Sequence, residues 1–330
     1  MQIFITCFLF ALGILFVVKG GDVFVDSATA IAKILKVPTF IIGATIVSLA
    51  TTLPEMIVSC MAAAEGSNEM AIGNAVGSVT ANTAIIMATA MIAMTIFAPR
   101  KKYMKQIILL ISATVVLWIA SLKGYLNIWG SIILVIIFAL FMIQNVLSAK
   151  NEISALNIKD AEKELKEKNK EKNEADTNGK NNIGKNILFF VLGAAAIVVG
   201  SRLMVDNGTN IARWLKVDER IIAVTLVAIG TSLPELVTTI TAIVKKESSL
   251  SAGNIIGANI IDISLILPLC SVISNKPIPV SHNSLFIDFP VCILVTLVAM
   301  IPILFRQKSS KFQGILLVAI YAVYLAVTIF

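Results

Sequence analysis

The chain has 330 residues, of which 57% are apolar and only 14% charged, and its formal net charge is +7. This composition, with a mean hydropathy of +0.90, excludes an ordinary soluble domain and predicts an integral membrane protein. In such a protein the basic residues report on membrane orientation, so we expect no nucleic-acid partner. A single histidine, His282, argues against histidine-based metal or hydrolase chemistry.

Long apolar stretches run through the chain on both sides of one polar segment. A membrane-spanning helix needs roughly 20 mostly apolar residues. Ten stretches meet this length, five before the polar segment and five after it, and we expect the first to belong to the fold and not to be a cleaved signal. The predicted spans are residues 2–19, 39–64, 70–97, 104–122, 128–147, 186–205, 219–244, 249–275, 284–305 and 311–329.

The polar segment, residues 149–185, is dominated by Lys, Glu, Asn and Asp, and is predicted to be a solvated linker that begins with a short charged helix around 157–172. It separates a first transmembrane unit, 1–148, from a second, 186–330. With the N-terminus outside, 21 of the 27 Lys and Arg residues fall on the cytoplasmic side. The positive-inside rule therefore predicts a multi-pass protein of the plasma membrane with both termini outside and a cytoplasmic linker.

The two units carry the same sequence pattern at an offset of 180 residues. Residues 12–55 align with 192–235 without a gap, and 20 of the 44 pairs are identical. Because each unit has five spans, an odd number, the second unit enters the membrane in the opposite sense. The predicted fold is therefore all-α, with ten transmembrane helices in two inverted five-helix repeats, and such repeats place a transport site near the membrane midplane.

Glu55 and Glu235 occupy equivalent positions in the middle of two predicted spans. A charged carboxylate there costs at least ~2.5–3.5 kcal/mol unless it is paired or hydrated. No Lys or Arg lies near either glutamate in these spans, so a mobile cation is the simplest partner. Pro54 and Pro234 precede the glutamates and each removes a helix hydrogen bond, which predicts a kink and frees carbonyl oxygens, among them that of Ala50.

Hydroxyl and amide side chains accompany these acids. Residues three and four positions before each glutamate share its helical face, and the second repeated motif, 73–82 and 253–262, adds further polar groups and a third deep acid, Asp262. Such oxygens are the ligands that Ca²⁺ and Na⁺ prefer. The candidate ion ligands are Ala50, Thr51, Thr52, Glu55, Ser78, Asn82, Thr231, Ser232, Glu235, Asn259 and Asp262.

Other polar residues are assigned ordinary structural roles. Asp26 and Asp206 lie close to basic residues and to membrane ends, which favours capping or ion pairing, and Asp288 is expected at the membrane interface. Cys7, Cys60, Cys270 and Cys292 lack metal-ligand spacing and are expected to act as small apolar residues.

On these motifs the chain resembles the cation/Ca²⁺ exchanger superfamily, and within it the Na⁺/Ca²⁺ exchangers of prokaryotes. The resemblance implies antiport of Ca²⁺ against Na⁺ by alternating access, four ion sites between helices 2, 3, 7 and 8, and sliding of helices 1 and 6. It implies that Glu55 and Glu235 bind Ca²⁺ and that Thr51 and Thr231 contribute backbone oxygens. It places Thr52, Ser78, Asn82, Ser232 and Asp262 around the Na⁺ sites or the central position.

The chain departs from the family pattern at Ala50, Thr52 and Ala258, and Ala258 removes a hydroxyl that a water or Asn259 would have to replace. H⁺-coupled or K⁺-dependent exchange stays an alternative, because carboxylates that release a metal can take up protons and the K⁺-dependent branch also carries the aspartate. A cation channel is a remote alternative, since channels build acidic rings from symmetric subunits. We expect no enzymatic activity, no cofactor and no obligatory protein partner; the expected partners are Ca²⁺, Na⁺ and the lipid bilayer.

Overall fold

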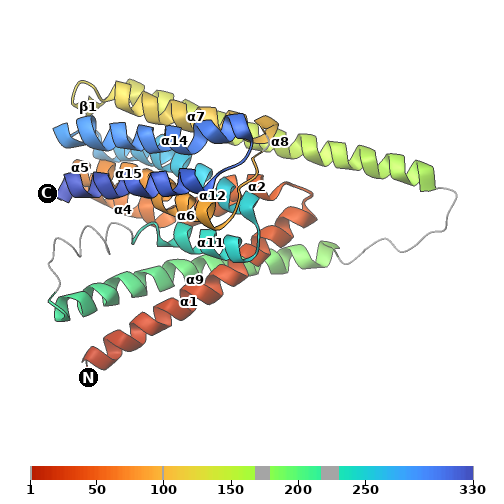
Figure 1. The fold of residues 1–330 in the computed structure, drawn as a ribbon, viewed down its shortest axis with the longest axis horizontal. Helices are drawn as coiled ribbons and strands as arrows, with labels where there is room; N and C mark the ends of the chain where they lie inside the picture. Colours follow the sequence, from red (N-terminus) through yellow and green to blue (C-terminus); the bar gives the residue numbers. More distant parts are fainter. Residues whose placement is uncertain (1, 99, 168–178, 217–229, 330) are drawn as a thin grey trace.

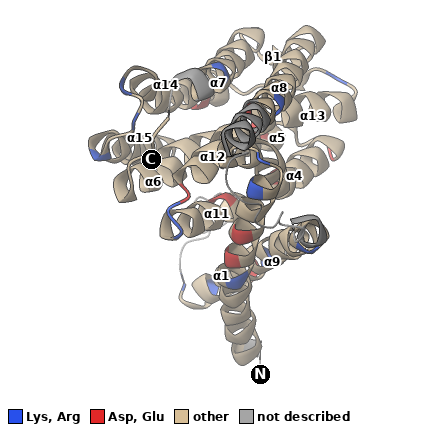
Figure 2. Ribbon diagram, turned by 90° about the vertical axis from the view of Figure 1, so that its right-hand side faces the viewer, with Lys and Arg blue, Asp and Glu red and all other residues tan. Residues whose placement is uncertain are grey.

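The structure, a computed structural model, describes every residue except 1, 99, 168–178, 217–229 and 330. It is built almost entirely from helices, most of them lying roughly alongside one another (Figure 1). In Figure 2 the charged residues, Lys, Arg, Asp and Glu, occupy only a few positions along the helices. Among the described residues, 8 helices are long and apolar enough to cross a membrane, or 9 when one bent pair counts as a single span.

The first half of the chain begins with a helix that runs well past the predicted end of the first span. No proline interrupts it before Pro38, so the helix continues through the charged residues that follow the apolar stretch. A second helix is bent by 46° between its two parts. The elements are α1 (Gln2–Ile34), α2 (Thr39–Ile42), η1 (Gly43–Val47), α3 (Ser48–Thr51), α4 (Leu53–Ala64), α5 (Asn68–Ala81), η2 (Asn82–Met87), α6 (Ala88–Ala93), α7 (Arg100–Ala120), β1 (Tyr125–Leu126) and α8 (Ile128–Glu167).

The second half again begins with one long helix. Half of the predicted seventh span, and the middle of the predicted linker, fall outside the described residues. The described flanks of the linker extend the neighbouring helices, and α8 projects beyond the bundle (Figure 1). The elements are α9 (Gly179–Trp214), α11 (Leu233–Val244), α12 (Ser248–Ile261), η4 (Asp262–Ile266), α13 (Leu267–Ser274), β2 (Ile278–Pro279), η5 (Ser284–Asp288), α14 (Phe289–Arg306) and α15 (Lys311–Ile329).

Helices α1 and α9 lie side by side, apart from most of the bundle (Figure 1). Their backbones approach closely at glycines: a Cβ added to Gly200 would lie 2.8 Å from the carbonyl oxygen of Gly13, and one added to Gly193 would lie 3.0 Å from that of Gly20. Small residues allow such approach in membranes, where dispersion contacts replace the hydrophobic effect between helices. The two helices therefore form one tightly matched pair.

The main apolar core lies on the side of α4, α5, α11 and α12 that faces away from the α1–α9 pair. It gathers buried side chains from α5, α7, α8, α12, α13 and α14, while a smaller cluster joins α1 and α9 to the start of the bent second helix. A two-residue antiparallel ladder ties Tyr125–Leu126 to Ile278–Pro279, so loops of the two halves are joined. The four helices α4, α5, α11 and α12 thus lie between two apolar layers, and the predicted site residues lie in these helices or next to their ends.

Candidate functional site

The repeated motif lies at a helix break in the first half and at a helix start in the second. Thr52 separates α3 from α4 with φ −82° and ψ −1°, and Ser232 precedes α11 with nearly the same angles, φ −87° and ψ 9°. Pro54 and Pro234 occupy the first turn of the helix that follows each break, where a missing N–H is tolerated. Both glutamates consequently lie in the first turn of a helix, where the helix dipole favours negative charge.

Each glutamate receives a hydroxyl from the opposite half of the chain. The Ser232 hydroxyl donates to Oε1 of Glu55 over 3.1 Å. The Thr52 hydroxyl donates to the Ser48 carbonyl over 2.6 Å and lies 3.4 Å from Oε1 of Glu235. All four residues are fully buried. Because these contacts join positions 52 and 235 with 232 and 55, the two motifs face one another at a single place in the molecule.

Several carboxylate oxygens in this cluster have no hydrogen-bond partner among the described residues. Within the part of the chain that the structure describes, Oε2 of Glu55, Oε2 of Glu235 and both oxygens of Asp262 are buried and unpartnered. A buried carboxylate left in this way carries a large desolvation cost. Cations that bind hard oxygen ligands would remove that cost, as Na⁺ and Ca²⁺ do.

Asn74 and Asn254 link the same two motifs. The Thr51 hydroxyl lies 3.2 Å from Oδ1 of Asn254, and the Thr231 hydroxyl lies 3.5 Å from Oδ1 of Asn74. Asn74 also donates to the backbone carbonyl of Glu55, over 3.3 Å. These asparagines belong to the second repeated motif, 73–82 and 253–262, but were not predicted as site residues. The signal that could have found them is their retention at the 180-residue offset.

The remaining predicted residues differ in how directly they join this cluster. The Ser78 hydroxyl lies within hydrogen-bond distance of the Ser232 hydroxyl, at 3.4 Å, so Ser78 belongs to the cluster. Asn82 and Asp262 stand at equivalent places, each opening a π-helical stretch, and both are buried with side-chain atoms that lack hydrogen-bond partners. Ala50 lies in α3, half-buried, one turn before Pro54.

Asn259 makes a contact that has no equivalent in the other half. Its Nδ2 donates to the Thr83 hydroxyl over 2.8 Å, while its Oδ1 is buried without a partner. The positions offset by 180 residues from these two are Val79 and Ile263, which are apolar. A polar pair thus exists on one side of the cluster only, next to Ala258.

No compact group of acids defines the place by itself. Among the described residues, no three His, Cys, Asp or Glu side chains lie close enough to hold one metal ion together. A cation here would therefore have to draw on hydroxyl, amide and carbonyl oxygens in addition to carboxylates. The motif residues supply these groups from α3, α5, η2 and α12 and from the residues that directly precede α4 and α11.

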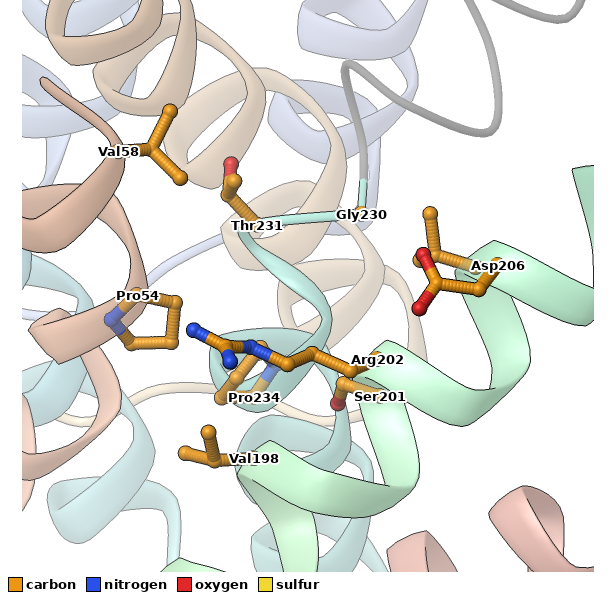
Figure 3. Close-up of a pocket in the computed structure, with 10 residues that line it drawn as sticks. Pro54, Val58, Val198, Ser201, Arg202, Asp206, Gly230, Thr231 and Pro234 are labelled. Carbon is orange, nitrogen blue, oxygen red and sulfur yellow. The ribbon is translucent and has the colours of Figure 1, made fainter. Parts of the chain in front are cut away.

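A cavity of about 140 Å³ adjoins the first turns of α4 and α11. Pro54 and Pro234 form part of its wall, together with Thr231 and residues of α9 (Figure 3). The α9 side contributes a basic and an acidic residue, Arg202 and Asp206. The cavity therefore lies between α9 and the helices that carry Glu55 and Glu235.

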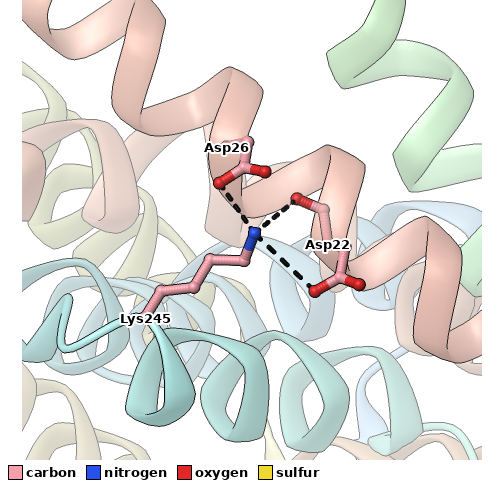
Figure 4. A network of polar contacts seen from close by, with 3 residues as sticks. All are labelled: Asp22, Asp26 and Lys245. Carbon is pink, nitrogen blue, oxygen red and sulfur yellow. Dashed lines mark hydrogen bonds and ion pairs between the residues drawn. The ribbon is translucent and has the colours of Figure 1, made fainter.

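An ion-pair network joins α1 to the end of α11 (Figure 4). Nζ of Lys245 lies 2.7 Å from Oδ1 of Asp26 and 3.7 Å from Oδ1 of Asp22, and it donates to the Asp22 carbonyl over 3.4 Å. The pairing expected for Asp26 from its sequence position is confirmed. At Asp288, the carboxylate accepts a hydrogen bond from the Tyr324 hydroxyl over 2.9 Å.

Comparison with known proteins gives consistent relatives over almost the whole chain. The family described as "Sodium/calcium exchanger protein" matches residues 5–147 and 185–330. The sodium/calcium exchanger MaX1 of Methanosarcina acetivorans is 31% identical, with 96% of each chain covered. The inner membrane protein YrbG of Escherichia coli is 30% identical, with 96% of this chain and 95% of that protein covered.

Solved structures with the same fold include the sodium-calcium exchanger NCX_Mj soaked with 2.5 mM Na⁺ and 10 mM Sr²⁺. That chain is 26% identical, with a TM-score of 0.80 and coverage of 98% of this chain and 99% of the other. A shorter similarity links the chain to sodium/potassium/calcium exchanger 2 of Homo sapiens, at 30% identity over 40% of this chain and 21% of that protein.

Proposed function

We infer that this chain, which belongs to the sodium/calcium exchanger protein family, carries Ca²⁺ in exchange for Na⁺ across a membrane by alternating access. Family membership and the exchanger fold of its structural neighbours support this function. These relatives also favour a transport function over an enzymatic one, since MaX1 is named as an exchanger.

The observation that carries the ion-binding proposal is that each of two buried glutamates contacts a hydroxyl from the opposite half of the chain. Each glutamate keeps one unpartnered oxygen, and these oxygens are the proposed Ca²⁺ ligands. We propose that Thr51 and Thr231 add backbone oxygens, and that the carbonyl of Ala50, freed by Pro54, lies in the same shell. Mutually exclusive occupancy by one divalent or several monovalent ions then couples the two fluxes.

The Na⁺ sites are proposed to surround the glutamates. The residues assigned to them are Thr52, Ser78, Asn82, Ser232 and Asp262, of which Asn82 and Asp262 have unpartnered buried atoms. Asn259 is assigned to the position where Ala258 lacks a hydroxyl, because its Oδ1 is also free. We propose to add Asn74 and Asn254 to this set, because their side-chain oxygens lie within 3.5 Å of the Thr231 and Thr51 hydroxyls.

We further propose the membrane arrangement that such exchange requires. Ten spans form two inverted repeats, with both termini outside the plasma membrane and the linker in the cytoplasm. The paired helices α1 and α9 slide together across the bundle and uncover the site first on one side and then on the other. Their close glycine contacts support movement as one unit.

The coupling ion has one alternative with a specific observation in its favour. Relatives named sodium/potassium/calcium exchangers match part of the chain, one of them at 30% identity over 40% of it. We propose Na⁺ without K⁺ because the whole-length relatives of known type are named sodium/calcium exchangers. H⁺ coupling has no comparable support here.

Ca²⁺ uptake into proteoliposomes under imposed Na⁺, K⁺ and pH gradients, applied one at a time, tests the proposal. We expect an outward Na⁺ gradient alone to drive saturable uptake, with no further requirement for K⁺. Uptake that requires K⁺ would transfer the chain to K⁺-dependent exchange. Failure of every gradient to drive uptake would overturn the exchange proposal, and large single-channel currents would replace it with a channel.

A further inference from the structure

Arg202 stands in the wall of the cavity that adjoins the ion-binding cluster. It projects from α9, and its guanidinium reaches past Pro234 toward Pro54 (Figure 3). Asp206, one turn further along α9, lines the same cavity. Within the described residues, Arg202 has no ion pair within 4 Å. A fixed positive charge therefore faces a space that leads toward a site for cations.

The cavity lies directly beside the two repeated motifs. Its lining includes Thr231, whose hydroxyl bonds to Asn74, and the two prolines that immediately precede Glu55 and Glu235. A cation that enters through this cavity comes close to Arg202 before it reaches the glutamates. No equivalent function for a basic residue follows from the ligand set, because arginine cannot coordinate a metal ion.

The repeat shows that this charge is specific to one side. The position offset by 180 residues from Arg202 is Asp22, which is acidic, whereas Asp206 and its counterpart Asp26 are identical. Asp22 and Asp26 are held by Lys245 at the end of α11. Helix α9 thus carries Arg202 where α1, the equivalent helix of the other repeat, carries an acid.

We propose that Arg202 is a specificity-determining residue that weakens entry of divalent relative to monovalent cations from the α9 side. This inference rests on the proposed exchange of Ca²⁺ for Na⁺. Coulomb repulsion is proportional to the charge of the ion, so its effect on affinity for Ca²⁺ is the square of its effect for Na⁺. For a separation of about 10 Å in water, the factors are roughly two-fold for Na⁺ and four-fold for Ca²⁺.

The test measures apparent affinities for Ca²⁺ and Na⁺ separately from each side of oriented membrane vesicles at low ionic strength. Arg202→Gln removes the charge, Arg202→Glu reverses it and Arg202→Lys keeps it. We expect Arg202→Glu to raise the affinity from the α9 side by roughly four-fold for Na⁺ and 16-fold for Ca²⁺. For Arg202→Gln we expect increases of roughly two-fold for Na⁺ and four-fold for Ca²⁺. Added choline chloride should shrink both effects through screening.

Lys123→Gln is the matched control, because it removes an exposed positive charge on the same proposed side without touching the cavity. Asp206→Asn should act in the opposite direction to Arg202→Gln, lowering Ca²⁺ affinity more than Na⁺ affinity. Arg202→Lys should resemble the unmodified protein, which separates charge from packing.

Equal changes for the two ions, changes from both sides alike, or no change in Arg202→Glu would each overturn the inference. These outcomes are read from a protein that still exchanges Ca²⁺ for Na⁺. Absence of Na⁺-driven Ca²⁺ transport in the unmodified chain would instead contradict the proposed function, so the two failures are distinguishable.

Discussion

The Ser232 hydroxyl donates a hydrogen bond of 3.1 Å to Oε1 of Glu55, across 177 positions of sequence. Its counterpart is the 3.4 Å contact between the Thr52 hydroxyl and Oε1 of Glu235, which joins the same two segments in the reverse sense. Each contact engages one oxygen of a glutamate and leaves the second one without a partner. The pair therefore orients both carboxylates toward one place without neutralising either of them.

Replacing Glu55 or Glu235 by Gln should abolish Ca²⁺ transport. The substitution keeps the shape and removes the charge that a divalent ion needs, and loss of one partner of a buried charge pair costs about 3–5 kcal/mol, equivalent to more than 100-fold in affinity. The measurement is Na⁺-driven ⁴⁵Ca²⁺ uptake in proteoliposomes. Glu69→Gln, an exposed acid in the first turn of α5, is the control. Normal uptake by either Gln variant would refute the assignment.

Ser232→Ala should weaken Ca²⁺ binding by about ten-fold, because a hydrogen bond to a charged group contributes about 1.5–3 kcal/mol. The same change removes the 3.4 Å contact with Ser78. Ser232→Thr keeps the hydroxyl and copies the residue present at position 52, so it should retain most of the affinity. Isothermal titration with Ca²⁺ separates the two variants. Equal loss in both would point to packing instead of hydrogen bonding.

The repeated motif predicted many residues of this cluster, and the contacts that it did not predict have physical reasons. Prolines before both glutamates predicted helix breaks, and α4 begins directly after Thr52 while α11 begins directly after Ser232. The contacts of Asn74 and Asn254 depend on how the two halves pack against each other, which periodicity within one helix does not encode. The Asn259–Thr83 bond breaks the repeat's symmetry and so could not be inferred from it.

Gly257→Ala should destabilise the fold. An added Cβ would lie 2.6 Å from the carbonyl oxygen of Ala44 and 2.8 Å from its Cα, so α12 and η1 would have to move apart. Overpacking of this kind costs about 1–3 kcal/mol. Thermal unfolding in detergent measures the loss. Gly184→Ala is the control, because no described atom lies within 4 Å of a Cβ there. An unchanged melting temperature for Gly257→Ala would show that the helices are less closely packed.

Lys245→Met should alter the balance between transport states. Lys245 joins α11 to two acids on α1, one of the helices proposed to slide, but its pairs are partly exposed, with 68% of the Asp26 side chain accessible. An exposed pair contributes up to about 1 kcal/mol, which corresponds to at most about a five-fold change in the ratio of two states.

The expected result is a change of that size in the apparent Ca²⁺ affinity on the side that bears Lys245, with little loss of thermal stability. Because screening already weakens the pair, high salt should bring the unmodified protein toward the variant. Lys245→Glu combined with Asp26→Lys restores opposite charges and should recover the original affinity. If the swapped pair behaves like Lys245→Met, the contact does not hold α1 against α11 during transport.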